Sequence, residues 1–252
     1  RRLGTLAPYA SPDGLHWRLL IDEVEAAEAE LPTADMVMPP VHYEPVGGLY
    51  KWKDAYYASG QNAYMHANLR DYHGRVARSY ISPDFVQWQP CGAAQFVVPE
   101  QHDLLGPGHS REGLQTHEGI SVWNRGNVLL GLTGIWYGAA EWEDVTIDLG
   151  LLISNDGLHF RKPSQDWVFL ERAPDGAWDQ GGLLQGQGFE NVGDQTYVYY
   201  GAWDPRNWEE SPPRGGVGIA VLPRDRFADI SVDLRHQGAG DYQVDQPVCQ
   251  FM

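Results

Sequence analysis

One heptapeptide recurs three times along the 252-residue chain and constrains the fold more than any other feature. It reads SPDGLHW at 11–17, SPDFVQW at 82–88 and SNDGLHF at 154–160, so its copies begin 71 and then 72 residues apart. A fixed period of this kind is typical of architectures built from repeated structural units. The sequence therefore predicts one large repeat domain.

Each copy of the heptapeptide reads as a turn between two β-strands. Runs such as RVARSYI and DLGLLI lead into the turn, and an aromatic residue resumes the sheet after it. Turns favour Ser, Pro, Asn, Asp and Gly, and an Asp in a turn accepts hydrogen bonds from backbone N–H groups just ahead of it. We therefore predict structural roles in turns, and not catalysis, for Asp13, Asp84 and Asp156.

A second repeated element lies between those copies and reads as a β-hairpin. It spans 43–60, 117–134 and 184–201, with its turns in the segments KWKDA, WNRGN and NVGDQ. Each unit then has a polar-headed strand, a hairpin return and a third strand that leads to the next turn. Such units predict an all-β fold, specifically a β-propeller built from four-stranded blades. A β-sandwich of irregular strands is the alternative, but it does not explain why the heptapeptides stay in step.

The units predict a propeller that is incomplete at its N-terminus. Residues 7–17 supply only the later part of a blade, two full units follow, and a third runs from residue 184 to about 232. We therefore expect a partial propeller domain over 1–232, with 233–252 as the start of a following element or a tail. An open propeller exposes strand edges, so such a domain is expected to need further chain or a partner for stability.

Charge and cysteine content narrow the class of partner. The formal net charge is -16, so the field of the protein repels phosphate backbones and anionic lipid surfaces. No stretch approaches the roughly 18 apolar residues that a membrane helix needs. Cys91 and Cys249 lie far apart without metal-type spacing, which indicates neither a disulfide framework nor a zinc site. We expect a soluble protein with a neutral partner, and neither nucleic acid nor membrane; compartment and oligomeric state stay open.

These features resemble the five-bladed β-propeller glycoside hydrolases of families 32 and 43. The resemblance rests on the S-x-D-G-x-x-W blade ends, the Tyr-Tyr hairpins and the carboxylates that head successive blades, and it runs from Ala7 to about Val232. It implies that the first strand of each blade begins at a central funnel, where an acidic residue points into a sugar site. By position, Glu44 in YEPV matches the second acid, which modulates acidity, and Glu118 in HEGI matches the third, the general acid. The first acid would lie upstream of Arg1.

The implied chemistry needs carboxylates in pairs. Glycoside cleavage uses one protonated acid and one ionised carboxylate, about 5 to 9.5 Å apart depending on the stereochemical outcome. Glu44 would help to keep Glu118 protonated, although the family usually has the shorter Asp at that position. His117, directly before Glu118, would point to the other face of a regular strand. No cofactor is required; the resemblance allows a Ca²⁺ ion at the propeller axis, but no acidic loop with calcium spacing is present.

Polar and aromatic side chains near these strand ends are candidates for substrate binding. Amide groups can hydrogen-bond to sugar hydroxyls, and aromatic rings offer flat faces on which sugar rings stack. The predicted substrate-binding residues are His117, Trp136, Gln185, Gln187, Trp203 and Asp204.

The function predicted from these residues is a glycoside hydrolase that cleaves a carbohydrate by carboxylate acid–base catalysis. One alternative is a non-catalytic carbohydrate-binding propeller, which the absence of an acid on the first strand would favour. Another is a glycoside phosphorylase on the same fold, which would need basic residues for inorganic phosphate. Only Arg125 and Arg214 are candidates for that role. If the first acid lies upstream of Arg1, this chain alone is expected to be inactive.

Overall fold

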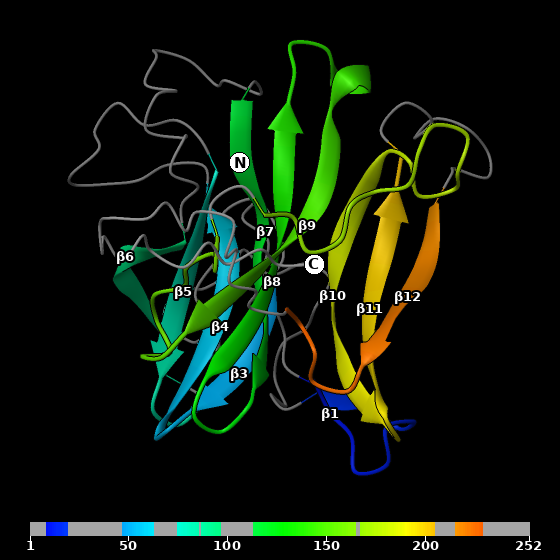
Figure 1. Ribbon diagram of the computed structural model, residues 1–252. Helices are drawn as coiled ribbons and strands as arrows, with labels where there is room; N and C mark the ends of the chain where they lie inside the picture. The colour runs from blue at the N-terminus through cyan, green and yellow to red at the C-terminus, as the bar shows by residue number, and fades with distance from the viewer. Residues whose placement is uncertain are drawn as a thin grey trace, which may run out of the picture.

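The computed structural model describes residues 9–19, 47–62, 75–85, 87–96, 113–164, 167–204 and 215–228. These residues form strands throughout, apart from the short 3-10 helix η2 (Trp142–Asp144). The all-β prediction is therefore confirmed for the described part of the chain (Figure 1). Within that part, no helix has the length and apolar character needed to cross a membrane.

The strands form three consecutive antiparallel units, which we call sheets 1, 2 and 3. Sheet 1 has the order β3-β4-β5-β6, with β3 (Gly48–Trp52), β4 (Ala55–Asn62), β5 (Val76–Ser82) and β6 (Gln89–Phe96). Sheet 2 consists of β7 (Gly113–Asn124), β8 (Leu129–Gly138) and β9 (Thr146–Ser154), and sheet 3 of β10 (Gly182–Val192), β11 (Gln195–Trp203) and β12 (Gly215–Pro223). A separate short hairpin pairs β1 (Tyr9–Ala10) with β2 (Arg18–Leu19).

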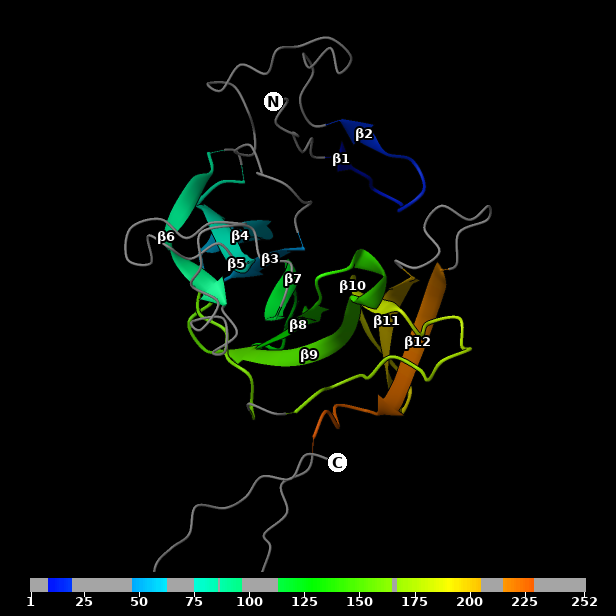
Figure 2. The same ribbon diagram turned by 90° about the horizontal axis from the view of Figure 1, so that it is seen from above.

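The three sheets fan out from a common centre. Seen from above, β3, β7 and β10 lie toward the middle, and β6, β9 and β12 lie toward the periphery (Figure 2). Sheets 2 and 3 join at one parallel pair, Gly182 with Ile147, which makes them a continuous six-stranded sheet. The predicted hairpin turns are confirmed, because Trp52 pairs with Ala55 and Val192 pairs with Gln195 across two-residue turns.

The heptapeptide turns have the hydrogen bonds that their sequence predicts. The Oδ1 atom of Asp13 accepts from the backbone N–H of Leu15 at 2.9 Å and of His16 at 2.8 Å. Asp156 accepts in the same way from the backbone N–H groups of Leu158 and His159. Asp84 accepts from the N–H of Gln87 at 2.8 Å. The backbone N–H and the side chain of His16 lower the pKa of Asp13. These carboxylates are therefore turn residues, as predicted.

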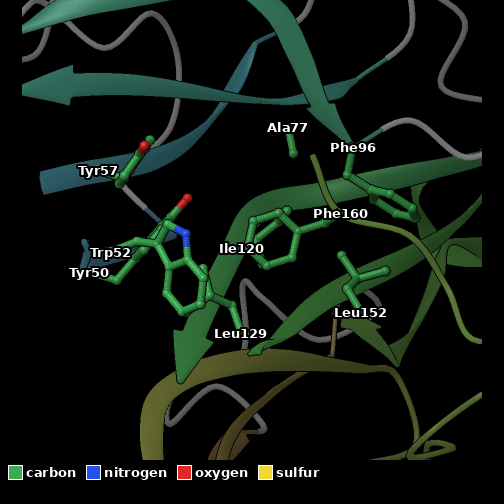
Figure 3. Close-up of a cluster of buried hydrophobic side chains, with 9 residues drawn as sticks. All are labelled: Tyr50, Trp52, Tyr57, Ala77, Phe96, Ile120, Leu129, Leu152 and Phe160. Atoms are coloured by element: carbon green, nitrogen blue, oxygen red, sulfur yellow. The ribbon is translucent and has the colours of Figure 1, made fainter. Parts of the chain in front are cut away.

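Sheets 1 and 2 pack face to face through a mixed aromatic and aliphatic core (Figure 3). Sheet 1 contributes Tyr50, Trp52, Tyr57, Ala77 and Phe96, and sheet 2 with its following turn contributes Ile120, Leu129, Leu152 and Phe160. Burial of this much apolar surface is the main force that holds two sheets together.

Sheets 2 and 3 have a core of their own. Leu130, Leu132 and Leu151 of sheet 2 cluster with Val198 of sheet 3. Alternation along β8 explains how one sheet serves two cores, because Leu129 faces sheet 1 while Leu130 and Leu132 face sheet 3. The sheets therefore stack as consecutive repeats. Closure into a ring, the number of five blades and the domain boundaries at 232 and 233 stay predictions.

Candidate functional site

The first strands of the three sheets meet at a β-bulge in β7. The pairing of β7 with β8 loses register between His117 and Ser121, and the pairing of β10 with β11 loses register between Gln185 and Phe189. Bulges bend a strand and re-aim its side chains, and they are enriched next to active sites. The β7 bulge contains Glu118, the predicted general acid.

Glu118 has a left-handed backbone, with φ at 57°, and Gly119 follows with φ at 74°. Glycine adopts this region freely, whereas a residue with a Cβ pays a steric cost to occupy it. The expectation that 117 and 118 lie on a regular strand with strict alternation is therefore wrong. The left-handed backbone at Glu118 interrupts the alternation of the strand.

Sheet 1 fixes the bulge from one side through two side chains of β4. The Oε1 atom of Gln61 accepts a hydrogen bond from the backbone N–H of Glu118 at 2.9 Å. The hydroxyl of Ser59 accepts from the backbone N–H of Ile120, also at 2.9 Å. Bulged residues lose partners from their own ladder, so these bonds satisfy groups that the bulge exposes.

Sheet 3 and strand β8 fix the carbonyl groups of the same segment. The Nε2 atom of Gln185 donates to the carbonyl oxygens of His117 at 3.0 Å and of Gly119 at 3.2 Å. The hydroxyl of Thr133 also donates to the Gly119 oxygen, at 2.7 Å. Five of the bonds around the bulge thus come from side chains on three other strands.

Gln187 holds the three first strands together just beyond the bulge. Its Nε2 atom donates to the hydroxyl of Ser121 at 3.0 Å and to the carbonyl oxygen of Gly47. The Ser121 hydroxyl donates to the same Gly47 oxygen at 2.7 Å. Gln185 and Gln187, predicted as substrate-binding residues, therefore have protein partners in this structure, and a role in contacting sugar stays a prediction.

Small residues allow this close approach of backbones. A Cβ atom at Gly47 would collide with the carbonyl oxygen of Glu118, and one at Gly48 with the carbonyl oxygen of Ile120. A Cβ at Gly119 would lie 3.0 Å from the backbone of Gly60. Glycine at these positions lets β3 and β4 contact the β7 bulge directly.

His117 and Trp136 form an interior pair rather than an open surface. Their rings stack with centroids 5.3 Å apart, and the guanidinium of Arg75 lies 3.8 Å from the centroid of the Trp136 ring. His117 is 6% exposed and Trp136 is 0% exposed. Burial, and then the positive charge of Arg75, lower the pKa of His117 to about 3, so the imidazole is neutral at physiological pH. Contact of either side chain with a substrate stays a prediction.

Trp203 and Asp204 lie at the end of β11, on the side of sheet 3 where β10 begins. Trp203 packs edge-on against Trp142 of η2, with ring centroids 5.5 Å apart. Asp204 is 1% exposed, and its Oδ2 atom accepts a hydrogen bond from Gln180 at 3.1 Å. Asp204 is therefore held within the protein, and its contact with a substrate stays a prediction.

The remaining predicted groups are Glu44 and Arg214, which lie outside the described residues. Arg125 pairs with Asp225 at 2.7 Å and lies over the ring of Trp123, remote from the bulge in the register of β7. Within the described ranges, no three His, Cys, Asp or Glu side chains gather where a metal ion could bind. A Ca²⁺ ion at the propeller axis stays a prediction.

Several residues that shape the site have no signal in the sequence. Ser59, Gln61 and Thr133 read as ordinary strand residues, and they reach the bulge only because the sheets stack. The double glycine at 47 and 48 is the one local hint, since glycine inside a strand often marks a close approach of backbone.

The arrangement brings a partly exposed glutamate to a strained backbone position beside a neutral, buried imidazole. Strained backbone persists only where the surroundings enforce it, and such positions cluster at functional sites. The hydrogen bonds fix the backbone from which the Glu118 side chain starts, and a carboxyl group is a common donor or acceptor of protons in catalysis.

Comparisons with known proteins give a likeness of structure alone. No protein-family model matches the chain, and no curated protein sequence matches it. Among solved structures, it is similar to a family 32 β-fructofuranosidase of Bombyx mori in complex with sucrose, with 12% identity, 75% of this chain and 37% of that chain covered, and a TM-score of 0.46.

Two further structures show similar values. A family 117 glycoside hydrolase of Zobellia galactanivorans has 12% identity over 69% of this chain and 50% of that chain, with a TM-score of 0.46. A β-1,2-mannobiose phosphorylase from Listeria innocua has 14% identity over 69% of this chain and 39% of that chain, with a TM-score of 0.44. The chain thus spans half or less of the length of these three proteins.

Proposed function

We propose that this protein is a carbohydrate-active enzyme of the glycoside hydrolase class, with Glu118 as its proton donor. The observation that carries the proposal is the left-handed backbone of Glu118 in a bulge held by side chains from β4 and β10. A fold does not need that strain for stability, because a regular strand would pair more completely with β8.

The chemistry assigned to Glu118 is protonation of the glycosidic oxygen as the bond from the anomeric carbon to that oxygen breaks. The leaving sugar takes the proton, and a second carboxylate or a water molecule supports the positive charge on the ring or attacks it. The neighbouring imidazole does not compete for this role, because His117 is buried and neutral. Glu44 is proposed as the carboxylate that holds the proton on Glu118 between turnovers.

Hydrolysis by the Glu118→Gln variant tests this assignment. The substrates are a panel of aryl glycosides and neutral oligosaccharides, and the full-length protein is used. Gln nearly keeps the size of Glu but carries no acidic proton to give, so kcat is expected to fall by about 10² to 10⁴. Glu190→Gln is the matched control, because Glu190 is an exposed residue of β10 away from the bulge.

The thermal midpoint of each variant separates loss of chemistry from loss of fold. Unchanged kcat in Glu118→Gln, with an unchanged midpoint, would contradict the assignment. Parallel reactions with inorganic phosphate show whether sugar phosphate is released, which would indicate a phosphorylase. Absence of turnover on every sugar in the unaltered protein would favour a non-catalytic carbohydrate-binding role.

A further inference from the structure

Two aromatic side chains form a flat surface on sheet 3, outside the β7 bulge itself, which we call the aromatic shelf. It consists of Trp178, in the loop before β10, and Tyr200 of β11. Their rings are within 20° of parallel, with centroids 6.1 Å apart. Trp178 remains 45% exposed to solvent, although exposure of so large an apolar side chain is unfavourable.

Glycines of β12 provide the seat for both rings. A Cβ atom at Gly216 would come within 3.0 Å of the six-membered ring of Trp178. A Cβ atom at Gly218 would collide with the phenol ring of Tyr200. Residues two apart on a strand share a face, so the two rings lie over one glycine strip on the same face of sheet 3.

A buried carboxylate holds the shelf in place. The hydroxyl of Tyr200 donates to the Oδ2 atom of Asp179 at 3.1 Å, and Asp179 is 9% exposed. Burial, and then the bond to Asp179, raise the pKa of Tyr200, so this hydroxyl keeps its proton. Asp179 directly follows Trp178, so the same bond ties down the loop that carries the indole.

The shelf lies in the same row of sheet 3 as a residue that holds the bulge. Gln185 of β10 pairs with Tyr200 of β11, and Tyr200 pairs with Gly218 of β12. Directly paired residues share a face, and neighbouring strands are about 4.8 Å apart. The row therefore leads from Gln185, which holds the bulge, across Tyr200 to Gly218. It spans two strand spacings, or about 10 Å, which is the length of a short oligosaccharide.

We propose that the aromatic shelf is a glycan-binding subsite, on which neutral sugar rings stack beside the catalytic position. A sugar ring has an apolar face of C–H groups that matches a flat, fixed aromatic surface. The net charge of -16 disfavours an anionic ligand. The choice of carbohydrate as the ligand rests on the proposed function, whereas the shelf itself is a feature of the structure.

Binding of unmodified oligosaccharides tests the subsite without relying on turnover. Calorimetric titration uses disaccharides and longer oligosaccharides of fructose, mannose, xylose and arabinose in a Glu118→Gln background. Adding Trp178→Ala is expected to raise Kd by about twofold to tenfold for the longer sugars, and Trp178→Phe is expected to have a smaller effect. Trp17→Ala is the matched control, because Trp17 is 62% exposed in the β1–β2 hairpin and should leave Kd unchanged.

The outcomes separate the subsite from the catalytic assignment. An unchanged Kd for every sugar in Trp178→Ala, or no binding by the background protein, would overturn the subsite. Weaker binding in Trp178→Ala with normal hydrolysis by Glu118→Gln would support the subsite and overturn the assignment of Glu118. If Trp178→Ala lowers the thermal midpoint, binding by the Trp178→Phe variant is used instead. A Kd of Trp178→Phe equal to that of the Glu118→Gln background would then overturn the subsite.

Discussion

Two adjacent residues in β7 have opposite environments. Glu118 is partly exposed at a left-handed position, whereas His117 is buried against the ring of Trp136. Both are candidate site residues from the sequence, because each side chain can donate or accept a proton. The structure gives them different environments, since Glu118 is partly exposed as a residue and His117 is buried.

His117 makes the stability of the fold depend on pH. Its folded pKa is about 3, below the ordinary value of 6.5, so between these values the unfolded chain binds a proton that the folded protein does not. The free energy of unfolding therefore falls as pH drops through this window, by up to about 1.4 kcal/mol per pH unit from this group. His117→Phe keeps a flat ring against Trp136 and is expected to weaken that dependence.

Urea unfolding at a series of pH values from 7 down to about 5 measures this effect, since carboxylates contribute less there than at lower pH. Tyr197→Phe serves as the control, because it alters an aromatic side chain of β11 without removing an imidazole. Parallel stability curves for His117→Phe and the unaltered protein would contradict the assigned pKa shift.

At the scale of strands, β7 and β10 both lose register midway along their length. The two irregular segments contact each other through Gln185, whose amide group donates to two carbonyl oxygens of β7. A single side chain thus donates to two carbonyl groups at the bulge. Its loss would remove one donor from each, and the Gly119 oxygen would keep only the hydroxyl of Thr133 among the described side-chain donors.

Gln185→Ala is expected to lower the free energy of unfolding by about 1–3 kcal/mol, because two partly buried carbonyl groups each lose one donor. Denaturant unfolding followed by circular dichroism measures the change. Gln195→Ala is the control, since Gln195 lies at an exposed hairpin end of the adjacent strand. Equal stability of the two variants would show that the hydrogen bonds of Gln185 contribute little to the free energy of unfolding.

Local structure could be predicted from the sequence where local chemistry decides it. The Ser-x-Asp turns and the two-residue hairpin turns follow from residues that lie next to each other, and the structure has them. The bulge at Glu118 could not be predicted in this way. His-Glu-Gly-Ile has the sequence pattern of an alternating strand. Two of the side chains that hold the bulge are distant in sequence: Gln61 precedes Glu118 by 57 residues, and Gln185 follows Gly119 and His117 by 66 and 68 residues.

At the scale of the whole molecule, a chain of buried hydrogen bonds joins sheets 1 and 2. The N–H of Ile120 donates to Ser59, the Ser59 hydroxyl donates to Gln95 at 2.6 Å, and the Gln95 amide donates to Tyr50 at 2.6 Å. The Tyr50 hydroxyl then donates to the carbonyl oxygen of Gly157 at 2.7 Å, in the third heptapeptide turn. The candidate site and a repeated turn are thus connected through the core.

Tyr50→Phe breaks this chain without removing the aromatic ring. The Gln95 amide and the Gly157 carbonyl then lose their partner in a buried place, so we expect a loss of about 1–3 kcal/mol in the free energy of unfolding. Tyr197→Phe is the control, because its hydroxyl bonds only to the exposed Gln195 among the described contacts. A loss no larger than that of the control would mean that this chain of bonds adds nothing to stability.

The repeat predicts that consecutive units stack, and the two cores between the sheets confirm that stacking for the described residues. Sequence alone could not predict which polar residues would enter those cores. Ser59, Gln95 and Tyr50 come together only through contacts between residues 36 to 45 positions apart, which local patterns do not encode.

The hydrogen bonds from Gln185 to the β7 bulge also bear on the order in which the site is assembled during synthesis of the chain. Gln185 is made 68 residues after His117, the carbonyl of which it holds. A nascent chain with sheets 1 and 2 complete would carry Glu118 in the right neighbourhood, yet with the bulge fastened on one side only. We therefore expect the chemistry proposed for Glu118 to require the docked third sheet, and an unfinished or misassembled chain to lack it.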